Sequence, residues 1–303
     1  MITYQHLIDS FNKAPFIIQF AFIAVIIMVI AIVSLIISLK VIRSFLKIKD
    51  KEILKYKNEY EPLLIEYLYS GNENEELTET QQSIIAKIKE GIKGASRRKS
   101  VITILTNLMN EVSGEMSDSI RTLYHETGLI DYAIIRLKSK RWHITSKAIV
   151  ELRRFKIQET HDLVSEFINH SKVEVRKETQ IYLVHLFKFE GLSFLDDLKT
   201  PLSEWHQLLL LESLLNLENQ QIGNIKPWLN SSNTSVVLFA LKLTKIYNQF
   251  EMKHELIELR MHPDKEVRRS AIHVLNQLFG YEFEETPKPK NRQLKSEGQI
   301  VIV

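Results

Sequence analysis

Residues Phe16 to Leu39 read FIIQFAFIAVIIMVIAIVSLIISL, and this stretch decides how the rest of the chain is placed. It has no charged side chain in 24 positions. A membrane-spanning helix needs about 20 mostly apolar residues to cross a hydrocarbon core about 30 Å thick. In lipid the backbone must pair its polar groups within the segment, so a helix is favoured although isoleucine and valine are abundant. We therefore predict a transmembrane helix over 16–39.

Two other structures could hold such a stretch. A buried helix of a globular core rarely runs this long without a charge. A cleaved signal peptide has a shorter apolar region, about 7–15 residues, and ends in a small-residue cleavage site that this sequence lacks. Both are weaker explanations than a membrane span.

The residues that flank this stretch are unequal in charge. Only Lys13 precedes it, whereas seven Lys and Arg residues follow between 40 and 57. Cytoplasmic flanks carry the excess of Lys and Arg, so we expect 1–15 outside the cell and the body of the protein in the cytoplasm. Residues 40–57 mix this charge with apolar residues, which predicts a basic juxtamembrane helix. The residues expected at the membrane surface are Lys40, Arg43, Lys47, Lys49 and Lys51.

The composition narrows the classes of function. The chain has 303 residues, no cysteine, 9 glycines and 7 prolines, which favours a mostly helical protein without disulfides or thiolate metal sites. Residues 58–303 carry 32 Lys and Arg against 34 Asp and Glu. A body so close to neutral lacks the usual charge of a nucleic-acid binder, so no nucleic acid is expected as a partner.

A repeat appears in the second half of the chain. Apolar positions recur at an anchor residue and at 4, 8 and 11 residues after it, which places them on one face of a helix. The anchors are 31, 31, 30 and 31 residues apart, namely Ile144, Val175, His206, Val236 and Val267. A preceding helix is indicated by apolar residues 11 positions before each anchor, namely Ala133, Val164, Leu195, Ile225 and Leu256. Each unit is thus predicted to be a helical hairpin that buries its apolar face only by stacking.

These residues resemble the HEAT-repeat family. The clearest copy is HPDKEVRRSA, from His262 to Ala271, and Val173-Glu174-Val175-Arg176 is a second. His206 and Val237 depart from the family pattern. The resemblance covers roughly 130–280 and implies an α-solenoid, whereas it says little about function, because the family serves diverse partners.

The expected fold is therefore all-α, with one transmembrane helix followed by an α-solenoid of HEAT-like hairpins. Its parts are an external N-terminus (1–15), the span (16–39), the juxtamembrane helix (40–57), an irregular helical capping region (58–127), the repeats (128–281) and a disordered tail (282–303).

No catalytic or metal-binding spacing is present among the ten histidines, and no cofactor or metal is expected. The most suggestive surface is the outward face of the second helices, at 2 and 9 residues after each anchor. In related solenoids this row lines the concave surface. The predicted partner-binding residues are Lys177, Val184, Leu208, Leu215, Leu238 and Lys245. The alternative is that neighbouring helices cover these side chains.

We expect a non-catalytic scaffold, anchored in the cytoplasmic membrane of a bacterium, that binds another membrane-associated protein. Proteins of this type suggest an accessory role in a surface-polysaccharide system, although no residue here points to it. A second hypothesis is an enzyme whose site in the groove combines Glu212, His206 and Lys245. Nucleic-acid binding is a third.

Overall fold

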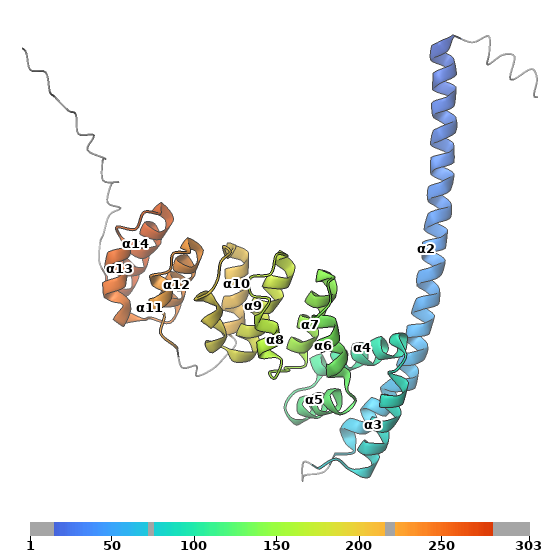
Figure 1. The fold of residues 1–303 in the computed structure, drawn as a ribbon, viewed down its shortest axis with the longest axis horizontal. Helices are drawn as coiled ribbons and strands as arrows, with labels where there is room; N and C mark the ends of the chain where they lie inside the picture. The colour runs from blue at the N-terminus through green and yellow to red at the C-terminus, as the bar shows by residue number, and fades with distance from the viewer. Residues whose placement is uncertain (1–14, 72–75, 216–221, 281–303) are drawn as a thin grey trace, which may run out of the picture. The chain divides into compact units, whose positions relative to one another are not determined.

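The computed structural model describes residues 15–71, 76–215 and 222–280, and every regular element in these ranges is a helix (Figure 1). The chain divides into two compact units, residues 1–127 and 128–303, and each is described by itself. The predicted external N-terminus up to residue 14 and the tail from 282 lie outside the described residues, as do the side chains of Lys49 and Leu215.

Residues Phe16–Tyr69 form one helix of 54 residues, α2. It joins the predicted span, the basic segment and twelve residues of the expected capping region, so the boundary expected after residue 57 falls inside a helix. Pro62 also lies within α2, where it removes a backbone donor at a cost of about 3 kcal/mol. Leu64 and Tyr67, just beyond it, are buried in unit 1, and this packing offsets the cost.

Unit 1 forms where the last part of α2 packs against α3 (Glu79–Gly91) and α4 (Ala95–Glu111), with α5 (Glu115–Glu126) beside α2 and α4. Gly91 is needed for this packing, because a Cβ there would lie 2.0 Å from the Tyr60 hydroxyl on α2. Thr78 caps α3: its hydroxyl accepts from the backbone N–H of Gln81, whose side-chain oxygen accepts from the backbone N–H of Thr78.

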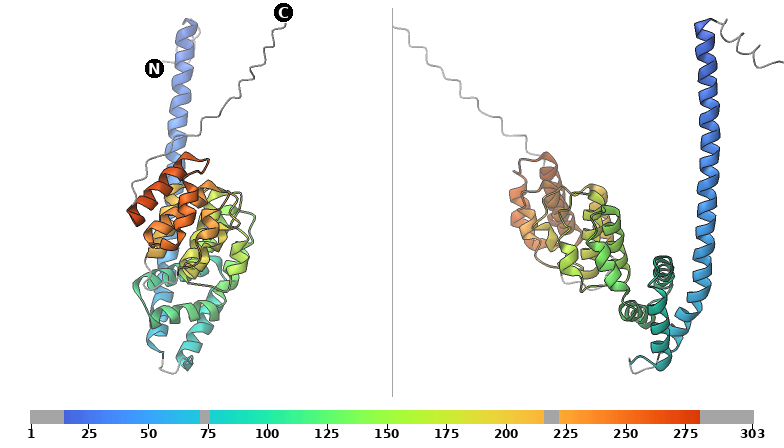
Figure 2. Two further views of the ribbon diagram at one scale, coloured as in Figure 1. Left: turned by 90° about the vertical axis from the view of Figure 1, so that its left-hand side faces the viewer. Right: turned by 45° about the vertical axis from the view of Figure 1, so that its right-hand side comes forward.

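Unit 2 is a row of five hairpins that lie side by side in chain order (Figures 1 and 2). The first segments are short: α6 (Leu129–Leu137), α8 (His161–Ser165), the 3₁₀ turn η1 (Glu190–Leu195), α11 (Lys226–Leu229), and η2 (Phe250–Met252) with α13 (Lys253–Leu259). The second helices are longer: α7 (Trp142–Arg154), α9 (Val173–Phe187), α10 (Glu204–Leu215), α12 (Thr234–Ile246) and α14 (Lys265–Phe279). A helical-repeat architecture is therefore confirmed.

The predicted register matches this packing. Every second helix begins two residues before its anchor, and all anchors except Ile144 are buried, while Ile144 is half-buried. The five residues that precede the anchors by 11 positions are buried as well. Burying one Leu, Ile or Val side chain contributes about 1.5–3 kcal/mol, so these two rows alone hold each hairpin closed and bind it to the next.

A side-chain donor at the position after the anchor closes the turn between the two segments in four of the five hairpins, and Val237 stands at this position in the other. Arg176 Nη1 donates to the His170 carbonyl oxygen at 2.6 Å, and Arg268 Nη1 donates to that of His262 at 2.8 Å. The Thr145 hydroxyl does the same to the Ser139 carbonyl oxygen at 3.1 Å. These arginines therefore satisfy carbonyl groups of their own turns.

Candidate interaction surface

The side chains named for a possible enzyme site face different neighbours in the described structure. No group of three His, Asp or Glu side chains there could hold a metal ion. His206 Nε2 lies 2.7 Å from Gln180 Oε1 on α9, whereas Lys245 Nζ lies 3.2 Å from His273 Nε2 on α14. Because these two side chains turn toward different neighbours, the site expected around them and Glu212 is not formed by these contacts.

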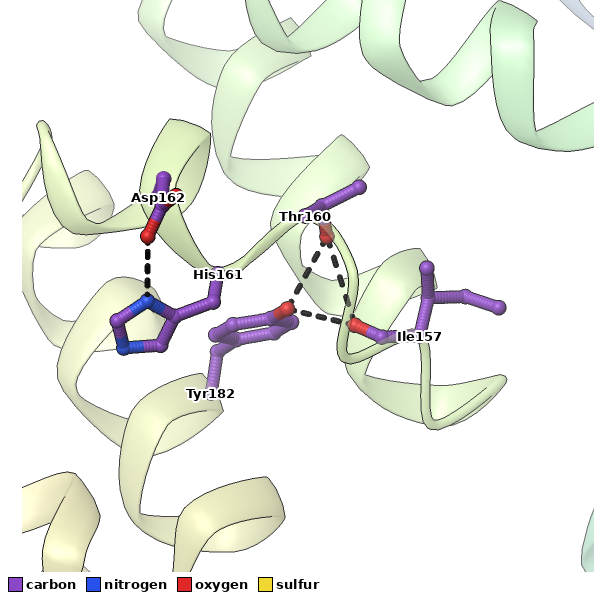
Figure 3. A network of polar contacts seen from close by, with 5 residues as sticks. All are labelled: Ile157, Thr160, His161, Asp162 and Tyr182. Carbon is purple, nitrogen blue, oxygen red and sulfur yellow. Dashed lines mark hydrogen bonds and ion pairs between the residues drawn. The ribbon is translucent and has the colours of Figure 1, made fainter.

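One polar network does look like a catalytic arrangement, with Thr160, His161, Asp162 and Tyr182 close together (Figure 3). The Tyr182 hydroxyl donates to the Ile157 carbonyl oxygen at 2.6 Å and lies 3.0 Å from the Thr160 hydroxyl. Burial raises the pKa of Tyr182 to about 12. Figure 3 shows the His161 and Asp162 pair as a separate contact, 3.0 Å long.

This network is structural. Tyr182 belongs to α9, and its hydrogen bond fixes the loop that follows α7. A phenol with a raised pKa that already donates to a carbonyl oxygen is a poor proton acceptor at neutral pH. The network therefore joins two neighbouring hairpins.

His206 replaces an aliphatic anchor in the middle hairpin and is 2% exposed. Burial, together with the nearby Lys177 ammonium, lowers its pKa to about 4. Since Gln180 Oε1 can only accept, Nε2 carries the proton of a neutral imidazole. The interpretation of His206 as a hydrogen-bonded packing residue agrees with this geometry.

The outward side of the second helices is the candidate site. We define the second-helix face as the residues 2, 6 and 9 positions after each anchor, which fall within about 60° on the side opposite the anchor. On the five helices these are Ser146, Val150, Arg153, Lys177, Ile181, Val184, Leu208, Glu212, Leu215, Leu238, Lys242, Lys245, Arg269, His273 and Asn276.

The predicted partner-binding residues do not share one environment on this face. Leu208 is 53% exposed, and Lys177, Leu238 and Lys245 are half-buried. Val184 is fully buried, which corrects its assignment to an exposed patch. It is covered because η1 packs directly on α9: a Cβ on Gly191 would lie 2.2 Å from the Leu183 carbonyl oxygen. The contiguous apolar row is therefore interrupted at α9.

The sequence prediction overlooked part of this face. It considered the positions 2 and 9 residues after each anchor and missed the intermediate position 6, which places Lys242 between Leu238 and Lys245 on α12. It also missed Trp205, which lies next to this face, one residue before its anchor, and is 66% exposed beside Leu208. Both positions lie 240–260° around the helix from the anchor, so a helical wheel drawn from the sequence would have placed them beside the outward rows.

Successive second helices are tied together by polar contacts near this face. Arg153 of α7 lies 3.1 Å from Glu178 of α9. Lys242 of α12 donates a hydrogen bond of 2.8 Å to the side chain of Gln207 of α10. On the other side of α12, Lys245 contacts His273 of α14. These contacts fix the spacing of the helices that form the face.

The predicted membrane-surface residues lie on α2. Lys40, Arg43, Lys47 and Lys51 are exposed, and the side chain of Lys49 is outside the described part. By length and composition α2 is the one described helix able to cross a membrane, and none of its most apolar window is buried inside the protein.

The comparisons with known proteins leave the family open. No family model matches the chain, and no curated protein matches its sequence. An engineered protein is 15% identical, with 73% of this chain and 96% of that one covered and a TM-score of 0.25. A designed armadillo repeat protein in complex with the peptide (KR)4 is 13% identical, with 72% and 98% covered and a TM-score of 0.23. Such low TM-scores carry no conclusion, so the repeat assignment rests on the hairpins themselves.

Proposed function

We propose that the chain is a membrane-anchored helical-repeat scaffold that holds a protein partner at the cytoplasmic face of the membrane. The observation that carries this proposal is the division of α2 into two environments. None of the most apolar window of α2 is buried inside the protein, whereas Tyr60, Leu64 and Tyr67 of the same helix are buried in unit 1.

Exposed apolar surface on this scale needs a cover. The stretch from 16 to 39 holds 21 apolar residues among 24 positions. Exposing them to water would cost about 25 cal/mol for every Å² of apolar area, so lipid is the cover that the length of the stretch fits. The 20 residues from Lys40 to Glu59 span about 30 Å at 1.5 Å per residue. In this arrangement they separate the membrane from the first buried residue of unit 1.

The same helix supports an orientation. Lys40, Arg43, Lys47 and Lys51 are exposed on this helix, and each contributes about 1 kcal/mol when it faces anionic lipid. With these residues on the cytoplasmic side, unit 2 also lies in the cytoplasm. The bacterial inner membrane and the surface-polysaccharide system stay predictions on which no described residue bears.

The membrane assignment is tested by extraction of whole-cell membranes with alkaline carbonate. We expect the full chain to stay in the membrane pellet and unit 2 to resist protease added outside intact cells. Ile27→Lys combined with Val33→Lys should move the protein to the supernatant, because each charge in the span costs about 2.5–3.5 kcal/mol. The matched control is Leu54→Lys, an exposed apolar residue of the same helix outside the span.

Two results would overturn the anchor. One is a wild-type chain that carbonate releases. The other is a mature chain that begins after residue 39, as a cleaved signal sequence would leave.

A further inference from the structure

We propose that the second-helix face binds an acidic protein segment that carries a large apolar side chain. This inference gives the chemical class of the partner of the scaffold described above, and so it rests on that function. It is carried by the charges, the exposed apolar side chains and the helix spacing of α9, α10 and α12.

The charge of this face differs from that of the chain as a whole. Its three rows hold five basic side chains, Arg153, Lys177, Lys242, Lys245 and Arg269, against one acidic side chain, Glu212. The near-neutral body of the chain therefore conceals a local excess of positive charge. A surface of one sign attracts partners of the other and accelerates their association.

Within the part of the chain that the structure describes, three of these cations have no acidic partner. Lys242 donates to the neutral amide of Gln207, and Lys245 donates to the imidazole of His273. An ammonium group can only donate, so these contacts orient the lysines without an acid beside them. No ion pair joins Lys177 to an acid among the described residues, and its ammonium lies near enough to His206 to lower the pKa of that imidazole.

Apolar side chains lie between these lysines. On α10 the exposed Trp205 and Leu208 stand on the helix between α9, which carries Lys177, and α12, which carries Lys242 and Lys245. Exposed Trp residues flanked by charge are typical of the centre of protein interfaces. Leucine has no favourable contact with a phosphate group, so this centre favours an acidic peptide over a nucleic acid.

The helix spacing sets the length of the segment. α9 packs on α10, and the long Lys242 side chain reaches from α12 to Gln207 on α10. At about 10 Å for each step between helices, the path from α9 to α12 spans about 20 Å. An extended peptide rises about 3.3 Å per residue, and about six residues cross the three helices. Glu212, on α10 within this path, is the one acid on the face and opposes such a ligand.

The test is fluorescence anisotropy with the full chain in a non-ionic detergent. The probes are a labelled octapeptide of alternating glutamate and leucine, the same peptide with lysine in place of glutamate, and an eight-residue oligothymidylate. We expect the acidic peptide to bind and to weaken with salt. Lys177→Glu and Lys242→Glu should each weaken it about tenfold, Leu208→Ala should weaken it several-fold, and Glu212→Gln should strengthen it about threefold.

The matched control is Lys199→Glu, the same change of charge at an exposed lysine outside the face, which should leave binding within about twofold. Circular dichroism of each variant checks that the helices persist. Equal loss in Lys199→Glu, tighter binding of the oligothymidylate, or no binding of the acidic peptide would each overturn the inference. A chain that binds the peptide but is released by carbonate would instead overturn the membrane anchor alone.

Discussion

The middle hairpin, η1 with α10, and the last hairpin, η2 and α13 with α14, follow one register with different residues. The anchor is buried His206 in the middle hairpin and buried Val267 in the last. In the middle hairpin the residue after the anchor is Gln207, whose side-chain amide donates to the Leu202 carbonyl oxygen at 3.3 Å. In the last hairpin it is Arg268, whose guanidinium donates to the His262 carbonyl oxygen.

The comparison shows which features of a hairpin are interchangeable. Any side-chain donor after the anchor can close the turn, and a neutral imidazole with one hydrogen bond can fill an aliphatic position. The spacing of the buried rows does not vary in the same way, because it decides which residues meet the neighbouring hairpin. Position in the register therefore matters more here than agreement with a consensus residue.

The largest expected effect concerns a position that differs sharply between these two hairpins. Fifteen residues before the anchor stands Gly191 in the middle hairpin and buried Met252 in the last. Gly191→Ala should destabilise the chain by about 3 kcal/mol, because its Cβ would overlap the α9 backbone at Leu183. Denaturant unfolding followed by circular dichroism measures this change.

The control for this prediction is Gly94→Ala, whose Cβ would have its nearest neighbour at 3.9 Å. This change should cost less than about 1 kcal/mol. Equal stability of the two variants would show that η1 can move away from α9 at no cost in free energy. The middle hairpin would then not require a glycine at this position.

The next effect comes from the anchor itself. The pKa of His206 is lowered from 6.5 to about 4, so between these pH values the unfolded chain binds the proton that the folded chain excludes. This contribution to stability is present in full above pH 6.5 and is lost as pH falls toward 4, by about 3 kcal/mol in total.

His206→Val, which supplies the residue of three other hairpins, should remove that part of the pH dependence. The measurement is the free energy of unfolding of both chains at pH 7 and pH 4.5. The difference in the free energy of unfolding between the two chains should change with pH. The contributions of carboxylates are the same in both chains and cancel in this difference. A constant difference would mean that His206 is accessible to protons in the folded state.

The smallest effect concerns the start of α14. Asp264 Oδ1 accepts hydrogen bonds from the backbone of Glu266 at 2.8 Å and Val267 at 3.2 Å. Asp264→Ala should cost about 1 kcal/mol and speed amide exchange in the first turn of α14. Lys172 occupies the same register before α9 without a side-chain cap, so Lys172→Ala should change little. Equal effects would show that the last hairpin does not depend on its cap.

Much of the fold followed from local spacing. The anchors and the start of each second helix could be predicted, because burial on one helical face leaves a periodic pattern of apolar residues in the chain. The first segments were harder to predict, since α8, η1 and α11 are short or of 3₁₀ form and leave less than two turns of pattern. The candidate face was predicted in part, with Lys177, Leu208, Leu238 and Lys245 on it, but without Lys242 and without the adjacent Trp205.

By itself the sequence determined the apolar stretch at 16–39 and the hairpin register, because both depend on residues close together in the chain. Only the tertiary structure decided that α2 continues through Pro62, since the packing of Leu64 and Tyr67 against other helices makes the proline tolerable. It also decided that Val184 is covered while Leu208 is exposed. Both residues occupy outward positions of a helix, but their exposure differs because it depends on whether another segment of the chain covers the side chain.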